Sequence, residues 1–244
     1  MQACRILARL LTYPDPAFMA ALPEIEAAIL AESAFGAREQ RAGLLSLARR
    51  LRSQDLIEVE EGYVGLFDRV RSLSLHLFEH VHGESRARGQ AMVDLLQVYR
   101  RQGVELDVNE LPDYLPVFLE FLSLLPEPQV AEMLDDAGDV LDALHGRLVK
   151  RESAYATVFQ ALLTMAGRKP SEPPAELEDE SLEAMDRAWE DQAVTFVGAE
   201  TPQVDGGCGK AQAIVARMTA GEKTTPPPPS GRGIGGGGRW SQTK

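Results

Sequence analysis

The sequence predicts an all-α fold. Leu, Ala, Glu and Arg, which favour helices, dominate the 244-residue chain, and aromatic residues make up only 6% of it. Apolar residues recur every three or four positions in one segment after another, which is the period of a helix with one buried face. With 44% apolar residues, the chain can bury a proper core. We therefore expect a single bundle-like domain of about nine helices without a convincing strand.

The first four helices are expected before residue 68. An apolar face covers 3–13 and ends at Pro14, because proline cannot continue a helix and disfavours the helical conformation before it. A second helix follows over 16–32. The apolar residues of 37–52 obey the i, i+3, i+4, i+7 rule, so this segment is predicted as an amphipathic helix. Another helix is expected over 55–67, with its apolar residues facing inward.

Two further helices are expected around the histidine-rich part of the chain. We predict the first over 72–81, ending at His82 and Gly83, since glycine is common just after a helix. Ser85 can then cap a helix over 86–101, whose apolar residues again follow the helical rule.

The last three helices enclose the most apolar segment. The segment 111–125 is apolar nearly all round, which is typical of a helix buried in the centre of a protein, and Pro126 ends it. Apolar periodicity then predicts helices over 128–150 and 153–166.

Composition divides the chain into three parts. Residues 1–168 are expected to form the helical domain. Residues 169–221 read as a loosely packed acidic linker with a short helix, since 172–191 hold nine acids and one base. Residues 222–244 are rich in proline and glycine and cannot bury a core, so we expect a disordered tail.

Charge and cysteine content narrow the function. A net charge of −12 argues against nucleic acid and against an anionic membrane as partners. The two cysteines, Cys4 and Cys208, suggest neither a disulfide framework nor a cysteine zinc site. The N-terminus does not read as a signal peptide, and the chain has no apolar run long enough for a membrane-spanning helix. These features favour a cytoplasmic protein.

A cluster of histidines and acids is the first candidate site. His76, Glu79 and His80 would share a face of the helix expected over 72–81, and Glu84 follows nearby. Histidine and carboxylate at this spacing can bind a metal, so a metal-dependent helical enzyme is one hypothesis. The full HExxH pattern is absent, however, and we favour structural or recognition roles for these residues, with no metal and no cofactor.

A second candidate lies in the most apolar helix. Asp113 and Glu120 are seven residues apart and are expected on one side of that helix. A buried acid is destabilising unless it is paired. Asp113 either caps or begins the helix while Glu120 pairs with Arg71 or Arg86, or both acids line a groove that accepts basic groups of a partner.

Several segments together resemble a known family. These are LLTYPD near the N-terminus, the long block FEHVHGESRARGQAMVDLL within residues 66–126, and the late VTF and GGCG elements. The chain looks like the NarJ-type chaperones for assembly of the molybdenum cofactor in respiratory nitrate reductase, within the wider TorD- and DmsD-like group. The resemblance covers residues 3 to about 215.

The resemblance implies a helical protein that is not an enzyme. Such a chaperone binds the N-terminal segment of the apo catalytic subunit in the cytoplasm while the molybdenum cofactor and an iron–sulfur cluster are inserted, with cofactor delivery proteins as further possible partners. It is absent from the finished complex. The wider group carries an acid-proline-Asp-His element, which corresponds here to Glu110-Leu111-Pro112-Asp113-Tyr114. Tyrosine replaces the histidine, so only a stacking or hydrogen-bonding role is expected there.

We predict a client-binding surface that combines the two candidate clusters. It consists of Glu79, His80, His82, Glu84, Asp113, Tyr114 and Glu120. The apolar neighbours Phe78, Leu115 and Phe118 are expected in the core. A permanent structural subunit of a larger complex remains the third hypothesis, beside the chaperone and the metal-dependent enzyme.

Overall fold

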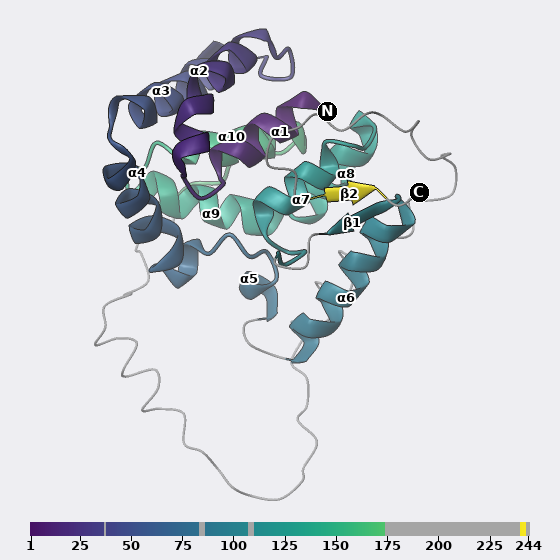
Figure 1. Ribbon diagram of the computed structural model, residues 1–244. Coiled ribbons are helices and arrows are strands. Elements are labelled where there is room, and N and C mark those ends of the chain that lie inside the picture. Colours follow the sequence, from purple (N-terminus) through teal and green to yellow (C-terminus); the bar gives the residue numbers. More distant parts are fainter. Residues whose placement is uncertain (37, 83–85, 107–109, 174–239, 243–244) are drawn as a thin grey trace, which may run out of the picture.

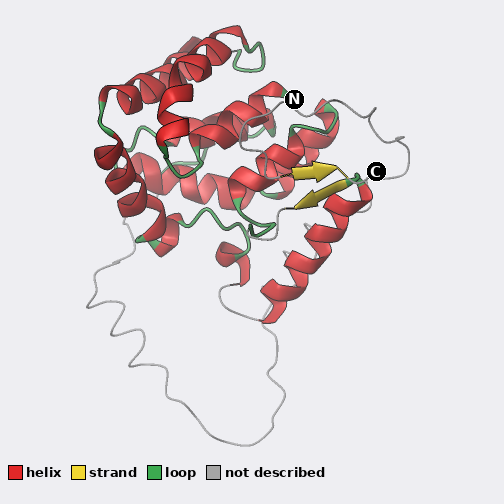
Figure 2. Cartoon of the chain, viewed as in Figure 1, coloured by secondary structure: helices red, strands yellow, loops and turns green. Residues whose placement is uncertain are grey.

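The computed structural model describes residues 1–36, 38–82, 86–106, 110–173 and 240–242. These residues form ten α-helices, one π-helical segment, one 3-10 segment and two short strands (Figures 1 and 2). The helices are α1 (Gln2–Leu10), α2 (Pro16–Ala31), α3 (Arg38–Ser53), α4 (Leu56–Tyr63), α5 (Glu79–His82), α6 (Arg86–Arg101), α7 (Leu115–Leu122), α8 (Glu127–Asp136), α9 (Gly138–Lys150) and α10 (Ala156–Met165). The all-α prediction is confirmed.

Local sequence explains where the first helices begin. The Asp15 carboxylate accepts a hydrogen bond from the Phe18 amide, and Pro16 occupies the first position of α2, where its missing N–H is harmless. At α4 the Asp55 and Glu58 side chains form a reciprocal capping box. The π-helical segment η1 (Val64–Asp68) continues α4, so the helix expected over 55–67 is present with a wider last turn.

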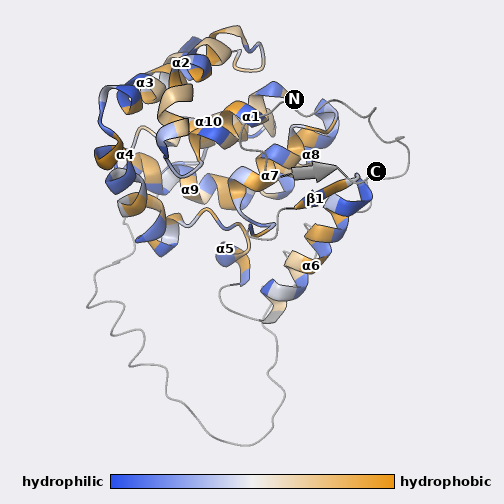
Figure 3. Ribbon diagram, in the orientation of Figure 1, coloured by the Kyte–Doolittle hydropathy of each residue, from blue (hydrophilic) through white to orange (hydrophobic). Residues whose placement is uncertain are grey.

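The core is built around α7. Every residue of α7 except Glu120 is buried, which confirms the prediction of a central helix. Helix α1 packs on α7, while α10 packs on α9, α8 and α3. Most helices carry hydrophobic residues on one side and hydrophilic residues on the other (Figure 3).

Two groups of elements flank this core. The hairpin of α2 and α3 packs at one end, with α4 running down beside it (Figure 1). At the opposite end α6 stands beside α5, and its main contacts are with α5 and strand β1 (Val104–Leu106). β1 pairs antiparallel with β2 (Trp240–Gln242), and Val104 lies opposite Gln242.

The predicted helix over 72–81 is wrong. Residues Arg71–Leu73 form the 3-10 segment η2, residues 74–78 are irregular, and only Glu79–His82 are α-helical. Leu73, Leu75 and Leu77, at every second position, are all buried. Burial at a period of two does not suit a helix, because alternate residues of a helix point to different sides.

Three other boundaries differ from expectation. The helix expected over 111–125 begins at Leu115, because residues 110–114 form a turn that holds a buried contact described below. The segment 128–150 is split at Ala137 into α8 and α9. Residues 104–106 and 240–242 form strands that were not expected, and the latter lie in the segment predicted as a disordered tail.

Several expectations fall outside the described residues. These are the acidic helix within 172–191, Cys208, Ser85 and Glu84, while Cys4 is buried in α1. Burial raises the pKa of the Cys4 thiol to about 11, so this thiol is unreactive at neutral pH. Among the described helices, each is too short or too polar to cross a membrane.

Candidate functional site

The candidate site forms where the irregular segment 74–78 meets the turn before α7. The amide of Leu77 donates to the Asp113 carbonyl at 2.9 Å, and the amide of Leu115 donates to the Leu75 carbonyl at 2.8 Å. Between these two bonds, His76 and Tyr114 form an antiparallel β-bridge. Backbone pairing therefore fixes the histidine segment against the Pro112-Asp113-Tyr114 turn.

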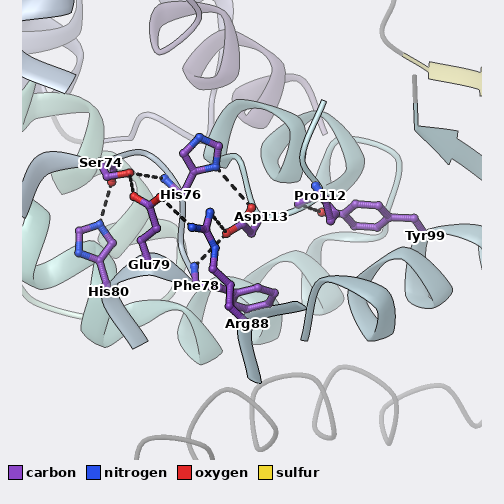
Figure 4. Close-up of polar contacts among 9 residues, drawn as sticks. All are labelled: Ser74, His76, Phe78, Glu79, His80, Arg88, Tyr99, Pro112 and Asp113. Carbon is purple, nitrogen blue, oxygen red and sulfur yellow. Dashed lines mark hydrogen bonds and ion pairs between the residues drawn. The ribbon is translucent and has the colours of Figure 1, made fainter. Parts of the chain in front are cut away.

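Asp113 is the centre of this contact. Its side chain is fully buried, and it lies between His76 and Arg88 (Figure 4). Oδ2 accepts from the Phe78 amide and from Arg88 Nη2, both at 3.3 Å. Oδ1 lies 3.4 Å from His76 Nδ1. The buried charge is thus compensated from three directions, as a buried carboxylate requires.

Arg88 connects Asp113 to a second acid. Its other terminal nitrogen, Nη1, donates to Glu79 Oε1 at 2.8 Å, so one guanidinium from α6 bridges two carboxylates. The second Glu79 oxygen accepts from the Ser74 hydroxyl. The side chain of Arg88 is 15% exposed and that of Glu79 is 27% exposed. The planar fork of arginine suits such a double contact.

The environment of Glu79 favours its charged form. Partial burial opposes ionisation, but the Ser74 hydroxyl, the Arg88 guanidinium and His76 together outweigh it and lower the pKa of Glu79. His80 adds a further link, because its Nε2 donates to the Ser74 carbonyl at 2.7 Å. Ser74 therefore joins the two ends of the segment that the histidines occupy.

A chain of aromatic groups runs from this cluster to α1. The rings of His76 and Tyr114 lie 5.3 Å apart. The Tyr63 hydroxyl donates to the Leu11 carbonyl at 2.9 Å, so Tyr114 is the donor in the 3.0 Å contact between the two tyrosine hydroxyls. Burial and the neighbouring Tyr114 raise the pKa of Tyr63, which stays neutral. The tyrosine at this position thus makes both stacking and hydrogen-bonding contacts.

Helix α6 is attached to the same turn from the other side. The hydroxyl of the buried Tyr99 donates to the Pro112 carbonyl at 2.7 Å (Figure 4). The Tyr99 ring packs on Phe121 of α7 at 4.4 Å between centroids. Arg88 and Tyr99, eleven residues apart on α6, therefore both bind the segment 112–113.

The structure brings together four of the seven residues predicted for the client surface. Glu79, His80, Asp113 and Tyr114 meet through the contacts above. His82 lies beside them, with its ring 6.1 Å from that of Phe78, and burial lowers its pKa. The expected core residues Phe78, Leu115 and Phe118 are indeed buried.

The other two residues do not join this cluster. Glu120 lies on α7, but Asp113 precedes that helix, so the two acids do not share a helical face as predicted. The pairing of Glu120 with Arg71 or Arg86 stays a prediction. Glu84 lies outside the described part of the chain.

Sequence reasoning missed Arg88, Ser74 and the two tyrosines Tyr63 and Tyr99. The alternation of Leu73, Leu75 and Leu77 was an available signal for the irregular segment. No comparable signal marked Arg88, because its partner Asp113 is 25 residues away in sequence. Long-range pairing of this kind is visible only once the fold is known.

Chemically, the cluster is an internal clamp. Its charged groups bind one another across three segments, α5, α6 and the turn before α7. Within the residues that the structure describes, no group of three or more His, Cys, Asp or Glu side chains is placed to hold a metal ion. The arrangement fixes a surface of mixed charge and aromatic character rather than presenting a reactive group.

Comparisons with known proteins identify the family. Residues 18–161 match the nitrate reductase delta subunit family. The chain is 42% identical to the nitrate reductase molybdenum cofactor assembly chaperone NarJ of Escherichia coli K12, over 84% of this chain and 86% of the relative. It is 38% identical to the probable assembly chaperone NarW of the same organism, over 81% and 84% of the two chains.

A more distant relative supports the same assignment. The probable assembly chaperone NarJ of Bacillus subtilis is 31% identical over 64% of this chain and 84% of the relative. The resemblance to NarJ-type chaperones predicted from the sequence is thereby confirmed. The chain belongs to the nitrate reductase delta subunit family.

Proposed function

We propose that this protein is a dedicated assembly chaperone for a respiratory nitrate reductase. It binds the N-terminal segment of the apo catalytic subunit in the cytoplasm and keeps that subunit competent while the molybdenum cofactor and an iron–sulfur cluster are inserted. It then leaves, so it is not part of the finished enzyme. The observation that carries this proposal is the similarity to NarJ over most of both chains.

The geometry of the clamp supports a binding role. Asp113 is fully buried, so it acts by holding the segment 74–79 and the turn 112–114 in place. The partly exposed side chains of His76, Glu79 and Tyr114 then form a prearranged surface. A prearranged surface binds a peptide without first losing conformational entropy of its own, which favours recognition. We propose Glu79, His80, His82, Glu84, Tyr114 and Glu120 as client contacts, with Asp113 as the residue that positions them.

The metal-dependent enzyme has less support. His76 and His80 do not share a helix, because His76 lies in the irregular segment and His80 lies in α5. The Nδ1 atom of His76 faces Asp113, while Nε2 of His80 donates to a carbonyl and so carries a proton instead of a free lone pair. Metal analysis of the protein purified without chelators tests this alternative, and a stoichiometric metal would favour it.

The permanent-subunit alternative has one observation in its favour, namely the description of the matched family as a delta subunit. Affinity purification from cells distinguishes the two. The chaperone hypothesis predicts that a tagged chain retains the cofactor-free catalytic subunit and that the mature enzyme lacks the chain. Recovery of the chain in stoichiometric amount with the molybdenum-loaded enzyme would contradict the chaperone hypothesis and favour a structural subunit.

A further inference from the structure

A pocket outside the clamp lies between α3, α4 and the turn that joins α9 to α10. It has a volume of about 280 Å³. Leu51 of α3, Val59 and Tyr63 of α4, and Tyr155 of the turn form its apolar floor, and each of them is at most 9% exposed. Pockets for small-molecule ligands typically measure about 300–1,000 Å³. This pocket is therefore better matched to one large side chain than to a small-molecule ligand.

The pocket is open because α4 carries a glycine where its wall faces the cavity. Gly62 lines the pocket, and a Cβ added there would have no heavy atom within 4 Å. Its neighbours in the helix, Val59 and Tyr63, are buried. A glycine inside a helix lowers helix stability relative to alanine, so α4 sacrifices some local stability at the position that leaves the cavity empty.

The opposite wall has an unusual backbone conformation. Glu152 has φ 54°, in the left-handed region that non-glycine residues rarely adopt. The amides of Glu152 and Ser153 donate to the carbonyls of Val149 and Leu148, which is the Schellman arrangement that ends a helix. This turn directs the chain from α9 across the pocket to Tyr155. Strained residues of this kind cluster at binding sites.

Charges of opposite sign border the pocket. Helix α4 contributes Glu58 to the pocket, carries Glu60 and Glu61 beside it, and has no basic residue. From α3 and the turn, Arg50 and Arg151 contribute guanidinium groups. A peptide that crosses the pocket would be attracted in one direction, with its basic residues toward α4.

Tyr63 joins this pocket to the clamp. Its ring lines the pocket, while its hydroxyl accepts from Tyr114 and donates to the Leu11 carbonyl. The ring of Tyr13, which is 43% exposed, packs edge-on against Tyr63 at 5.5 Å. An apolar and aromatic surface therefore continues from the pocket toward the surface that Asp113 positions.

From these observations we infer that the pocket between α3, α4 and the α9–α10 turn receives one large apolar side chain of an amphipathic helical segment of the client, with basic residues of that segment against α4. This inference rests on the proposed function, since it names the part of the protein that anchors the client. Peptide helices bind through a few apolar anchors in this way, and buried anchors supply most of the affinity.

The glycine offers a direct test. Gly62→Leu fills the pocket from within α4 without meeting another side chain, and it replaces a poor helix former by a good one. Gly65→Leu is the matched control, because Gly65 also has open space at its Cβ position but does not line the pocket. Binding of a peptide that spans the N-terminal segment of the catalytic subunit is measured by calorimetry for the full chain and both variants.

We expect Gly62→Leu to weaken peptide binding at least tenfold, and Gly65→Leu to bind within twofold of the unchanged protein. Circular dichroism should show both variants folded. A second series replaces each large apolar residue of the peptide by alanine, and one position should account for a loss of tenfold or more. Equal binding by the unchanged protein and Gly62→Leu would overturn the pocket assignment and leave the chaperone function intact. Absence of binding to the unchanged protein would overturn both.

Discussion

Replacement of Asp113 by alanine tests whether the clamp stabilises the fold. The substitution removes a buried carboxylate that accepts from the Phe78 amide and from Arg88, and that faces His76. Loss of an acceptor for a buried donor destabilises a protein by about 1–3 kcal/mol, and hydrogen bonds to charged groups contribute about 1.5–3 kcal/mol.

Two features of the structure place the expected effect toward the lower part of that combined range. The three contacts of the Asp113 carboxylate measure 3.3–3.4 Å, longer than typical hydrogen bonds. Arg88 also keeps its 2.8 Å bond to Glu79, so its charge is not left unpaired. We therefore expect Asp113→Ala to lower the free energy of unfolding by about 3 kcal/mol.

Urea denaturation followed by circular dichroism measures this change. Asp94→Ala is the control, since Asp94 lies on α6 and its bond to Gln90 is exposed, so we expect an effect within about 0.5 kcal/mol. A double-mutant cycle with Arg88→Met isolates the pair and should give a coupling of about 1 kcal/mol or more. A loss below about 1 kcal/mol for Asp113→Ala would refute the view that the buried carboxylate holds the segment.

Three further predictions concern other parts of the structure. Tyr63→Phe removes the hydroxyl between Leu11 and Tyr114, so thermal unfolding should show a loss of about 1–2 kcal/mol, and an unchanged midpoint would contradict the assigned bonds. Glu152→Gly relieves the left-handed conformation and should raise stability by about 0.5–1 kcal/mol in urea, whereas a loss would show that the side chain makes a stabilising contact. The lowered pKa of Glu79 means that its stabilising effect is present above the model value of 4.5 and is lost as pH falls through the still lower folded value. Stability below pH 4.5 should therefore fall less steeply in Glu79→Gln, and identical acid limbs for the two proteins would contradict this.

Helical periodicity predicted most of the fold. The segments 16–32, 37–52 and 86–101 match α2, α3 and α6 closely, because each has one apolar face against the core and a polar face outside. The burial of α7 also followed from its composition, since a helix that is apolar all round has no stable place at the surface.

The prediction failed where tertiary contacts override local preference. The segment 72–81 contains helix-forming leucines, but their alternation and the pairing of His76 with Tyr114 select an irregular conformation. The division at Ala137 likewise depends on packing, since the Arg168 side chain lies where a Cβ of Gly138 would stand. Neither contact can be read from residues close in sequence.

The candidate site was predicted in part for a related reason. Unusual residues drew attention to Glu79, His80 and Asp113, which do meet in the structure. Their chemistry was less accessible, because the roles of these residues depend on Arg88 and Ser74, which carry no distinctive pattern. Asp113 illustrates the difference: it was predicted as a groove residue or helix cap, and it is the buried acceptor that joins three segments.

The most direct test of the proposed function is the molybdenum content of the nitrate reductase catalytic subunit. The subunit is purified from cells that contain this chain and from otherwise identical cells that lack it, and molybdenum is measured per mole of subunit. We predict a subunit largely without molybdenum when the chain is absent, and a full complement when the chain is restored. A full molybdenum content in cells that lack the chain would contradict its role as an assembly chaperone.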